Sequence, residues 1–287
     1  MTPASTQGLR GWDPRLYQIA VLSTLLLYGV FRLDFEVQPG QAALILATVL
    51  LTQVVASRLA RLPRVDLRSA LISGLSLCLL LRTRSPALAV AVATFAVGSK
   101  FLLRLRGKHL LNPTNGALVL GLLVTPEVWV SPAQWGNAAV FAFAMACLGG
   151  LVVNRAARSD VTYAFLGFWL LVQFGRAFAL GDPLEIPLHR LSNGAFLLFT
   201  FFMISDPKTT PDSRLGRILF AGLVAWGAWY ITFRLFRTNG LLYSLAGFSL
   251  LVPLIDRLLP GPRYAWSSAP PPAPEAPLGA EAARAAG

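Results

Sequence analysis

Long apolar segments recur from one end of the chain to the other and constrain the fold more than any other feature. Examples run from Leu16 to Phe31, Ala42 to Ala56, Ala87 to Val97 and Leu215 to Phe233. About 20 apolar residues in a helix cross a hydrocarbon layer roughly 30 Å thick. Charged residues make up only 13% of the chain, against roughly 25% in a typical soluble domain. The sequence therefore predicts an all-α polytopic membrane protein.

The number of membrane crossings depends on two short segments. Apolar segments lie near residues 16–33, 39–57, 67–82, 86–105, 110–125, 136–154, 161–179, 191–204, 215–235 and 240–257. If all ten cross and the N-terminus is cytoplasmic, most of the 25 Lys and Arg residues fall in cytoplasmic loops, as the positive-inside rule requires. Residues 110–124 and 191–204 are short for a full span, and two re-entrant segments there would leave eight crossings. The charge distribution fits both counts.

The domain organisation follows from these segments. Residues 1–15 form a cytoplasmic N-terminal segment, 16–258 a transmembrane domain, and 259–287 a Pro/Ala-rich cytoplasmic tail that buries too little apolar surface to fold. The net charge of +12 is dispersed among short loops and forms no stripe for nucleic acid, so we expect membrane lipids as its neighbours. Both cysteines lie inside apolar runs, and no metal site is expected.

One short sequence motif, which we call the doubled phrase, occurs twice in the chain. Thr114-Asn115-Gly116-Ala117 and Ser192-Asn193-Gly194-Ala195 align as hydroxyl, amide, glycine and alanine, each before an apolar stretch that ends in a polar turn. In the ten-span count the two segments cross in opposite directions, which indicates two inverted halves, about 16–130 and 131–258. Inverted repeats with short or broken helices often place a ligand site near the bilayer midplane, at half-helix N-termini.

A purely structural interpretation of the same residues remains open. Asn112, Thr114, Ser192 and Asn193 are suitable N-caps, each worth about 1 kcal/mol to its helix. Lys100 and Arg176 lie near the ends of apolar runs, and we expect their side chains to extend to the membrane surface. The polar turn that begins at Asp206 is compatible with a solvated loop before the next helix.

Several motifs resemble one membrane protein family. They are DPRLYQIA from residue 13, GKHLLNPTNGALVLGLLV from 107, WVSPAQWG from 129, FFMISDPKTTPDSRLGR from 201 and GLLYSLAGFSLLVPLIDR from 240. Together they resemble the NqrB/RnfD family, which comprises the RnfD protein of the Rnf electron-transport complex and the NqrB protein of the sodium-pumping NADH:quinone reductase. The resemblance covers most of residues 13–257 and favours ten spans.

The resemblance implies a redox function. It implies an integral subunit of a flavin-based electron-transport chain in the bacterial cytoplasmic membrane, with two inverted halves shaped like urea transporters. It also implies other redox subunits as partners, quinone as a candidate redox partner, and coupling to ion translocation. The chain has no Gly-x-Gly-x-x-Gly motif after a strand, so another subunit must collect electrons from NADH.

The resemblance also implies a flavin, FMN or riboflavin, held without a covalent bond. Family members carry FMN esterified to a Thr in a Ser-Gly-Ala-Thr type motif, but the corresponding loop here reads LGDPLEIPLHRLSNGA and contains no Thr. Covalent FMN is therefore not expected, and the chain resembles stand-alone relatives that lack this motif. The candidate cofactor-binding residues are Asn112, Thr114, Asn115, Trp135, Ser192, Asn193, Asp206, Lys208, Thr209 and Thr210.

Three functional hypotheses follow. The first is a membrane electron-transfer subunit, for which the warrant is the resemblance. The second is a transporter or channel for a small polar solute, for which the warrant is the inverted doubled phrase. The third is a membrane scaffold for redox or biosynthetic partners, which the missing Thr allows.

Overall fold

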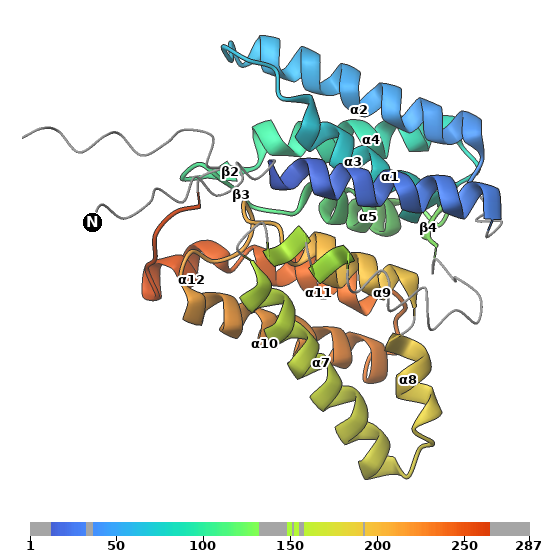
Figure 1. Ribbon diagram of the computed structural model, residues 1–287, viewed down its shortest axis with the longest axis vertical. Helices are drawn as coiled ribbons and strands as arrows, with labels where there is room; N and C mark the ends of the chain where they lie inside the picture. The colour runs from blue at the N-terminus through green and yellow to red at the C-terminus, as the bar shows by residue number, and fades with distance from the viewer. Residues whose placement is uncertain are drawn as a thin grey trace, which may run out of the picture.

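The computed structural model describes residues 13–32, 37–131, 148–150, 152–154, 158–191 and 193–264, and most of these are helical (Figure 1). The helices are α1 Pro14–Arg32, α2 Pro39–Leu59, α3 Leu67–Leu80, α4 Pro86–Leu102, α5 Pro113–Val124, α7 Ser159–Leu180, α8 Glu185–Leu191, α9 Gly194–Leu198, the π-helix η1 Phe199–Met203, α10 Arg214–Phe233, α11 Gly240–Ser249 and α12 Val252–Leu258. The strands are β1 Leu81–Thr83, β2 Arg104–Leu105, β3 Lys108–His109 and β4 Val128–Val130.

Three of the described helices are long and apolar enough to cross a membrane: α2, α7 and α10. The pair α11 and α12 gives a fourth if it is taken as one span bent by 50°. Shorter apolar helices occupy Arg15–Phe31, Leu67–Leu80, Pro86–Leu102, Pro113–Val124 and Gly194–Met203. The predicted class, a helical membrane protein, is confirmed, and the count of ten crossings stays a prediction.

Local sequence signals explain where several helices begin. Asp66 accepts a hydrogen bond from the Arg68 amide at 3.2 Å and so caps α3. Ser85 caps α4 in the same way, and proline occupies the first turn of α2, α4 and α5. Caps satisfy amides that have no partner within the helix, and proline fits the first turn because its missing N–H would be unpaired there.

The structure differs from an all-α prediction in three places. Strand β1 pairs antiparallel with β4, and β2 with β3, so the predicted spans at 67–82 and 86–105 end earlier, at Leu80 and Leu102. Residues 185–191, expected as loop, form α8. The predicted span 240–257 breaks between α11 and α12, and Pro253 lies in the first turn of α12. Proline removes a backbone donor, which favours such a break.

The two segments suspected of being short are short. Helix α5 has 12 residues and is therefore about 18 Å long, and α9 with η1 covers ten residues, Gly194–Met203. In its second half the α9 segment changes from α to π geometry at Phe199. Neither helix is long enough to cross a hydrocarbon layer of about 30 Å alone.

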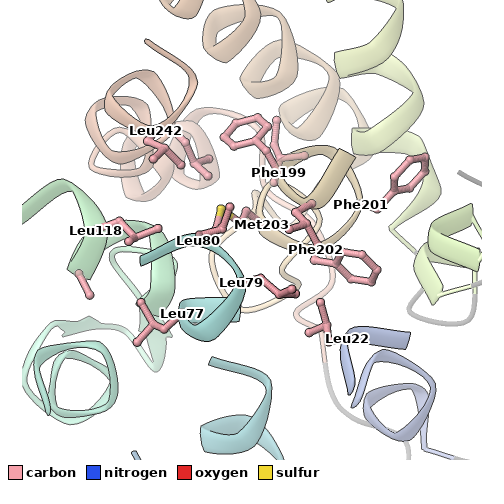
Figure 2. Close-up of a cluster of buried hydrophobic side chains, with 14 of the residues drawn as sticks. Leu22, Leu77, Leu79, Leu80, Leu118, Phe199, Phe201, Phe202, Met203 and Leu242 are labelled. Atoms are coloured by element: carbon pink, nitrogen blue, oxygen red, sulfur yellow. The ribbon is translucent and has the colours of Figure 1, made fainter. Parts of the chain in front are cut away.

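The core lies where the N-terminal and C-terminal helices meet. In Figure 1, α1 to α5 gather on one side and α7 to α12 on the other. Figure 2 shows the buried side chains between them, from α1, the end of α3, α5, η1 and α11. Leu77, Leu79, Leu80, Leu118 and Phe199 are almost completely buried. This cluster fixes both short helices against their neighbours.

Candidate cofactor site

Two polar loops far apart in the sequence meet beside the start of α5. Asn112 donates from Nδ2 to the carbonyl of Met203 at 3.3 Å and to Oδ2 of Asp206 at 3.3 Å. The His109 amide donates to the carbonyl of Lys208 at 3.2 Å. The loops that carry Asn-Pro-Thr-Asn and Asp-Pro-Lys-Thr-Thr-Pro thus form one structural unit.

An ion cluster joins these loops to the last helix. The ammonium of Lys108 donates to the carbonyl of Thr210 at 2.7 Å, to Oδ1 of Asp212 at 3.1 Å and to Oδ2 of Asp256 at 2.7 Å. The other oxygen of Asp256 accepts from the Asp212 amide at 2.7 Å. All three charged side chains are largely buried. Because a buried charge is stable only when it is paired, this cluster holds the hairpin β2–β3, the polar loop and α12 together.

Asp206 organises the polar loop around itself. Its Oδ1 accepts from the Lys208 amide at 3.0 Å, and its carbonyl accepts from the amides of Thr209 and Thr210, each at 3.1 Å. Burial raises the pKa of Asp206, and the Lys208 amide and the positive charge of Lys100 offset part of that rise. Thr209 and Thr210 are buried, and Arg158 donates from Nε to the hydroxyl of Thr210 at 3.2 Å. The loop is a folded polar structure and not a solvated turn.

A polar cavity of about 280 Å³ lies between these loops and the helices of the N-terminal half. We call it the polar cavity. Its lining includes Arg15, Gln53, Arg64, Asp66, Ser69, Ser73, Ser76, Lys100, Phe101, Arg104, His109, Asn112, Thr114, Phe202, Asp206 and Lys208. Cationic side chains outnumber carboxylates in this lining. An anionic or strongly hydrogen-bonding ligand therefore fits it better than a cation.

Lys100 does not reach the membrane surface, so the expectation that it snorkels is wrong. Its side chain is only 4% exposed, and its ammonium donates to the carbonyl of Ser69 at 2.7 Å and to the Ser69 hydroxyl at 3.1 Å. Asp206, another lining residue of the cavity, interacts electrostatically with this charge. Arg176 behaves differently, because it is partly exposed, pairs with Asp182 at 2.7 Å and stacks over Phe233.

His109 carries an unsatisfied nitrogen at the polar cavity. Burial lowers the pKa of His109 to about 4, and the positive charges of Arg104, Lys100 and Lys208 add to this effect. The imidazole is therefore neutral at neutral pH. Among the described residues, the buried Nδ1 of His109 has no hydrogen-bond partner. The buried Oε1 of Gln53, another lining residue, also has none there. Buried polar atoms without partners are costly, which makes both atoms candidates for ligand contact.

A second cavity of about 500 Å³ lies at the start of the other short helix. We call it the aromatic cavity. Its lining includes Trp129, Val130, Ser131, Trp169, Arg190, Asn193, Phe196, Phe199, Thr232, Thr238 and Asn239. Trp169 stacks on Phe196, with 6.0 Å between ring centroids, and on Phe165 at 6.1 Å. Apart from Arg190, this lining has none of the charges of the polar cavity.

The two copies of the doubled phrase cap their helices but do not occupy equivalent positions. Asn193 is the N-cap of α9 and accepts from the amides of Ala195 at 2.9 Å and Phe196 at 3.2 Å. In α5 the N-cap is Asn112, which accepts from the Asn115 amide at 3.0 Å. Asn115, which aligns with Asn193, lies inside the helix, and its Nδ2 donates to the carbonyl of Leu242 at 3.2 Å. The N-cap prediction is confirmed for both asparagines and is wrong for Thr114, which follows Pro113 inside α5.

The structure divides the predicted site residues among several places. Four of them, Asn112, Thr114, Asp206 and Lys208, line the polar cavity, and Thr209 and Thr210 are buried behind its wall. Asn115 faces α11, and Asn193 lines the aromatic cavity. Trp135 and Ser192 lie outside the described residues.

The sequence interpretation missed several lining residues. Ser69, Ser73 and Ser76 recur at intervals of four and three residues, so they occupy one face of α3, the face toward the polar cavity. Gln53 and Ser57 form a second such pair on α2, with Gln53 Nε2 donating to Ser57 at 3.2 Å. A search for polar residues at helical spacing inside apolar runs would have found both sets.

Fold and site together define an integral membrane protein with two short capped helices and a buried polar cavity. Residues 132–264 match the model of the NQR2, RnfD, RnfE family, the family that the sequence motifs resemble. The RnfD protein of Citrobacter koseri, a subunit of an ion-translocating oxidoreductase complex, is 32% identical over 126 residues, which are 43% of this chain and 34% of that protein.

Two further relatives carry the same name. The protein of Stutzerimonas stutzeri is 28% identical over 173 residues, which are 53% of this chain and 48% of the relative. That of Vibrio vulnificus is 30% identical over 134 residues, 43% of this chain and 34% of the relative. The matches thus span a third to a half of the length of these relatives.

Proposed function

We propose that the protein is a membrane electron-transfer subunit that holds a flavin, FMN or riboflavin, noncovalently in the polar cavity. The observation that carries the proposal is the convergence of the two family motifs on one cavity, through Asn112, Asp206 and Lys208. The names of the relatives, subunits of an ion-translocating oxidoreductase complex, support an electron-transfer role. A bound flavin would supply the one- and two-electron redox chemistry that the side chains lack.

The lining residues fit the polar edge of an isoalloxazine. Such a ring has amide-like donors and acceptors along one edge and an apolar body. His109 Nδ1 and Gln53 Oε1 are buried without hydrogen-bond partners in the described part of the chain, and Asn112, Thr114 and Ser73 add further groups to the same lining. Phe101 and Phe202 supply apolar surface. The ligand would thus satisfy atoms that the fold leaves unsatisfied.

The charged residues of the cavity have separate roles in this proposal. Lys100 and Asp206, which both line the cavity, balance each other, so that a neutral ring system would bind without an uncompensated charge beside it. Lys208, in the wall formed by the polar loop, favours a reduced and therefore anionic flavin. Neutral His109 orients the ring through its unsatisfied Nδ1.

Covalent attachment does not fit this chain. Residues 181–195, which include the start of α9, contain no threonine. Asn193 in this stretch is committed to capping the helix. The cofactor in this proposal is therefore exchangeable.

The proposal includes partners and a topology. Another redox subunit would supply the electrons, and quinone is the candidate acceptor, with ion translocation as the coupled process. The proposal includes ten spans in two inverted halves, with both termini in the cytoplasm of a bacterium. The opposite directions of the short helices support the inverted halves. The N-cap of α5 bonds to Met203 at the end of η1, and the start of α9 lines a cavity with Trp129, just after α5.

Purification in mild detergent followed by acid precipitation tests the proposal. We expect visible flavin absorbance in the native protein and release of the flavin into the supernatant on precipitation. Flavin that stays with the precipitate would show a covalent bond and contradict the noncovalent site. A colourless protein that moves a polar solute into liposomes would favour a transporter, and a colourless protein that only retains partner subunits would favour a scaffold.

A further inference from the structure

The seam between α7 and α10 carries an open groove that the proposed redox function does not use. These helices are two of the three that are long and apolar enough to cross a membrane, and they lie side by side in Figure 1. The groove, about 980 Å³, begins at Ser159 and Arg214 and runs past Gly167 to Leu171. A second hollow of about 510 Å³ continues from Leu171 to Arg234. The seam is therefore hollowed along its length.

The groove is apolar along its length and cationic at its ends. Tyr163 is 53% exposed and Leu171 is 68% exposed along the seam. A Cβ atom added at Gly167 would meet no atom within 4 Å, because the glycine opens the groove. Arg214 and Arg234 stand at opposite ends of α10, which has 20 residues and is therefore about 30 Å long. That length matches the thickness of a hydrocarbon layer, so an α10 that crosses the membrane would hold its two terminal guanidinium groups near the lipid headgroups.

The guanidinium of Arg214 has no partner among the described residues. Asp160, the carboxylate of the groove, is bound by Arg217 through distances of 2.9 and 2.5 Å. Arg214 is exposed, and in the part of the chain that the structure describes it forms no ion pair or hydrogen bond. An apolar channel that ends at an unpaired guanidinium matches an acyl chain that ends at a phosphate.

We propose that this groove binds a phospholipid with a net negative headgroup. One acyl chain lies along Gly167 and Leu171, and the phosphate is bound by Arg214. A transmembrane helix from another protein of the complex is a weaker match, since it would have to supply a carboxylate at Arg214. The site is independent of the flavin, because no residue of the groove lines the polar cavity.

Native mass spectrometry of the detergent-extracted protein, titrated with phosphatidylglycerol and with phosphatidylcholine, tests the site. We expect one phosphatidylglycerol to be retained more tightly than phosphatidylcholine. Arg214→Gln should weaken phosphatidylglycerol retention about fivefold and abolish the preference. Gly167→Leu should fill the groove and reduce retention of both lipids, without a clash in the fold.

Arg257→Gln is the matched control. Arg257 is exposed at the end of α12, and its loss changes the net charge by the same amount outside the groove. Equal phosphatidylglycerol retention by the two arginine variants would overturn the proposal. Unchanged lipid retention in Gly167→Leu together with loss of a co-purifying membrane protein would overturn it in favour of a partner helix. Unfolding midpoints close to that of the parent protein establish that each variant is folded.

Discussion

The polar cavity and the aromatic cavity lie at the starts of two short helices, α5 and α9, whose N-terminal sequences are nearly alike. Both starts are capped by an asparagine, Asn112 in one and Asn193 in the other. Around Asn112 the fold gathers Lys100, His109 and Asp206, whereas around Asn193 it gathers tryptophan and phenylalanine rings. The asparagine cap thus has the same structural role in both helices. The side chains that surround it, which come from other helices and loops, determine the chemistry of each cavity.

The largest effect on stability is expected from breaking the ion cluster that joins the hairpin β2–β3, the polar loop and α12. Lys108→Met should leave the carboxylates of Asp212 and Asp256 without their cation and destabilise the fold by about 3 kcal/mol. The unfolding midpoint in detergent measures this loss. Lys208→Met removes the same charge from the same polar region and should change stability little, because its ammonium has no ion pair among the described residues. Equal midpoints for the two variants would contradict the assigned role of the cluster.

The stability of the protein should also depend on pH through His109, which lines the polar cavity. Its pKa is near 6.5 when unfolded and about 4 when folded, so the unfolded state binds the proton more readily. The stabilising contribution is complete above the unfolded pKa and is lost as pH falls toward 4, by on the order of 3 kcal/mol. His109→Gln should flatten this part of the stability curve. If the variant keeps the parent's slope between pH 6.5 and 4, the histidine is not the titrating group.

Loss of either cap should have a smaller and nearly equal effect on stability. Asn112→Leu and Asn193→Leu each remove an acceptor from a first helical turn, at about 1 kcal/mol. Asn112 should cost somewhat more, since its Nδ2 also bonds to Met203 and Asp206. Thermal unfolding of the two variants side by side measures the difference. A larger loss at Asn193 would argue against the polar network around Asn112.

The smallest effect is expected in the aromatic cavity. Trp169 Nε1 is buried and has no hydrogen-bond partner among the residues that the structure describes, so Trp169→Phe removes an unsatisfied donor while keeping an aromatic ring against Phe196. These changes oppose each other, and we expect stability to shift by less than about 1 kcal/mol. The unfolding midpoint again measures it. A large loss would indicate that Nε1 has a partner, such as an ordered water or a bound ligand.

The sequence predicted the class of fold well because its signals are local. Apolar runs, Pro at the first turn of α4 and α5, and the caps at Asp66 and Ser85 mark most helix positions to within a few residues. The strands were missed because β1 and β4 have three residues each and pair with each other across 45 residues of sequence or more. Such pairings depend on tertiary contacts and leave no periodic signal.

The grouping of the candidate residues around one cavity was predicted only in part, for a related reason. Asn112, Asp206 and Lys208 were found from motifs and do meet at one cavity. Aligning Asn115 with Asn193 wrongly suggested that the two asparagines are structurally equivalent. The structure shows that Asn112, and not Asn115, caps α5. Lys100 was assigned to the membrane surface because nothing within its own segment indicates Ser69, 31 residues away, as its partner.

The flavin content of Asn112→Leu compared with Asn193→Leu tests the central claim most directly. Both variants lose a cap, so their stabilities serve as controls for each other. Binding in the polar cavity predicts that purified Asn112→Leu loses most of its flavin per protein and that Asn193→Leu keeps the parent's content. Loss of flavin in Asn193→Leu with full retention in Asn112→Leu would place the cofactor in the aromatic cavity and contradict the account.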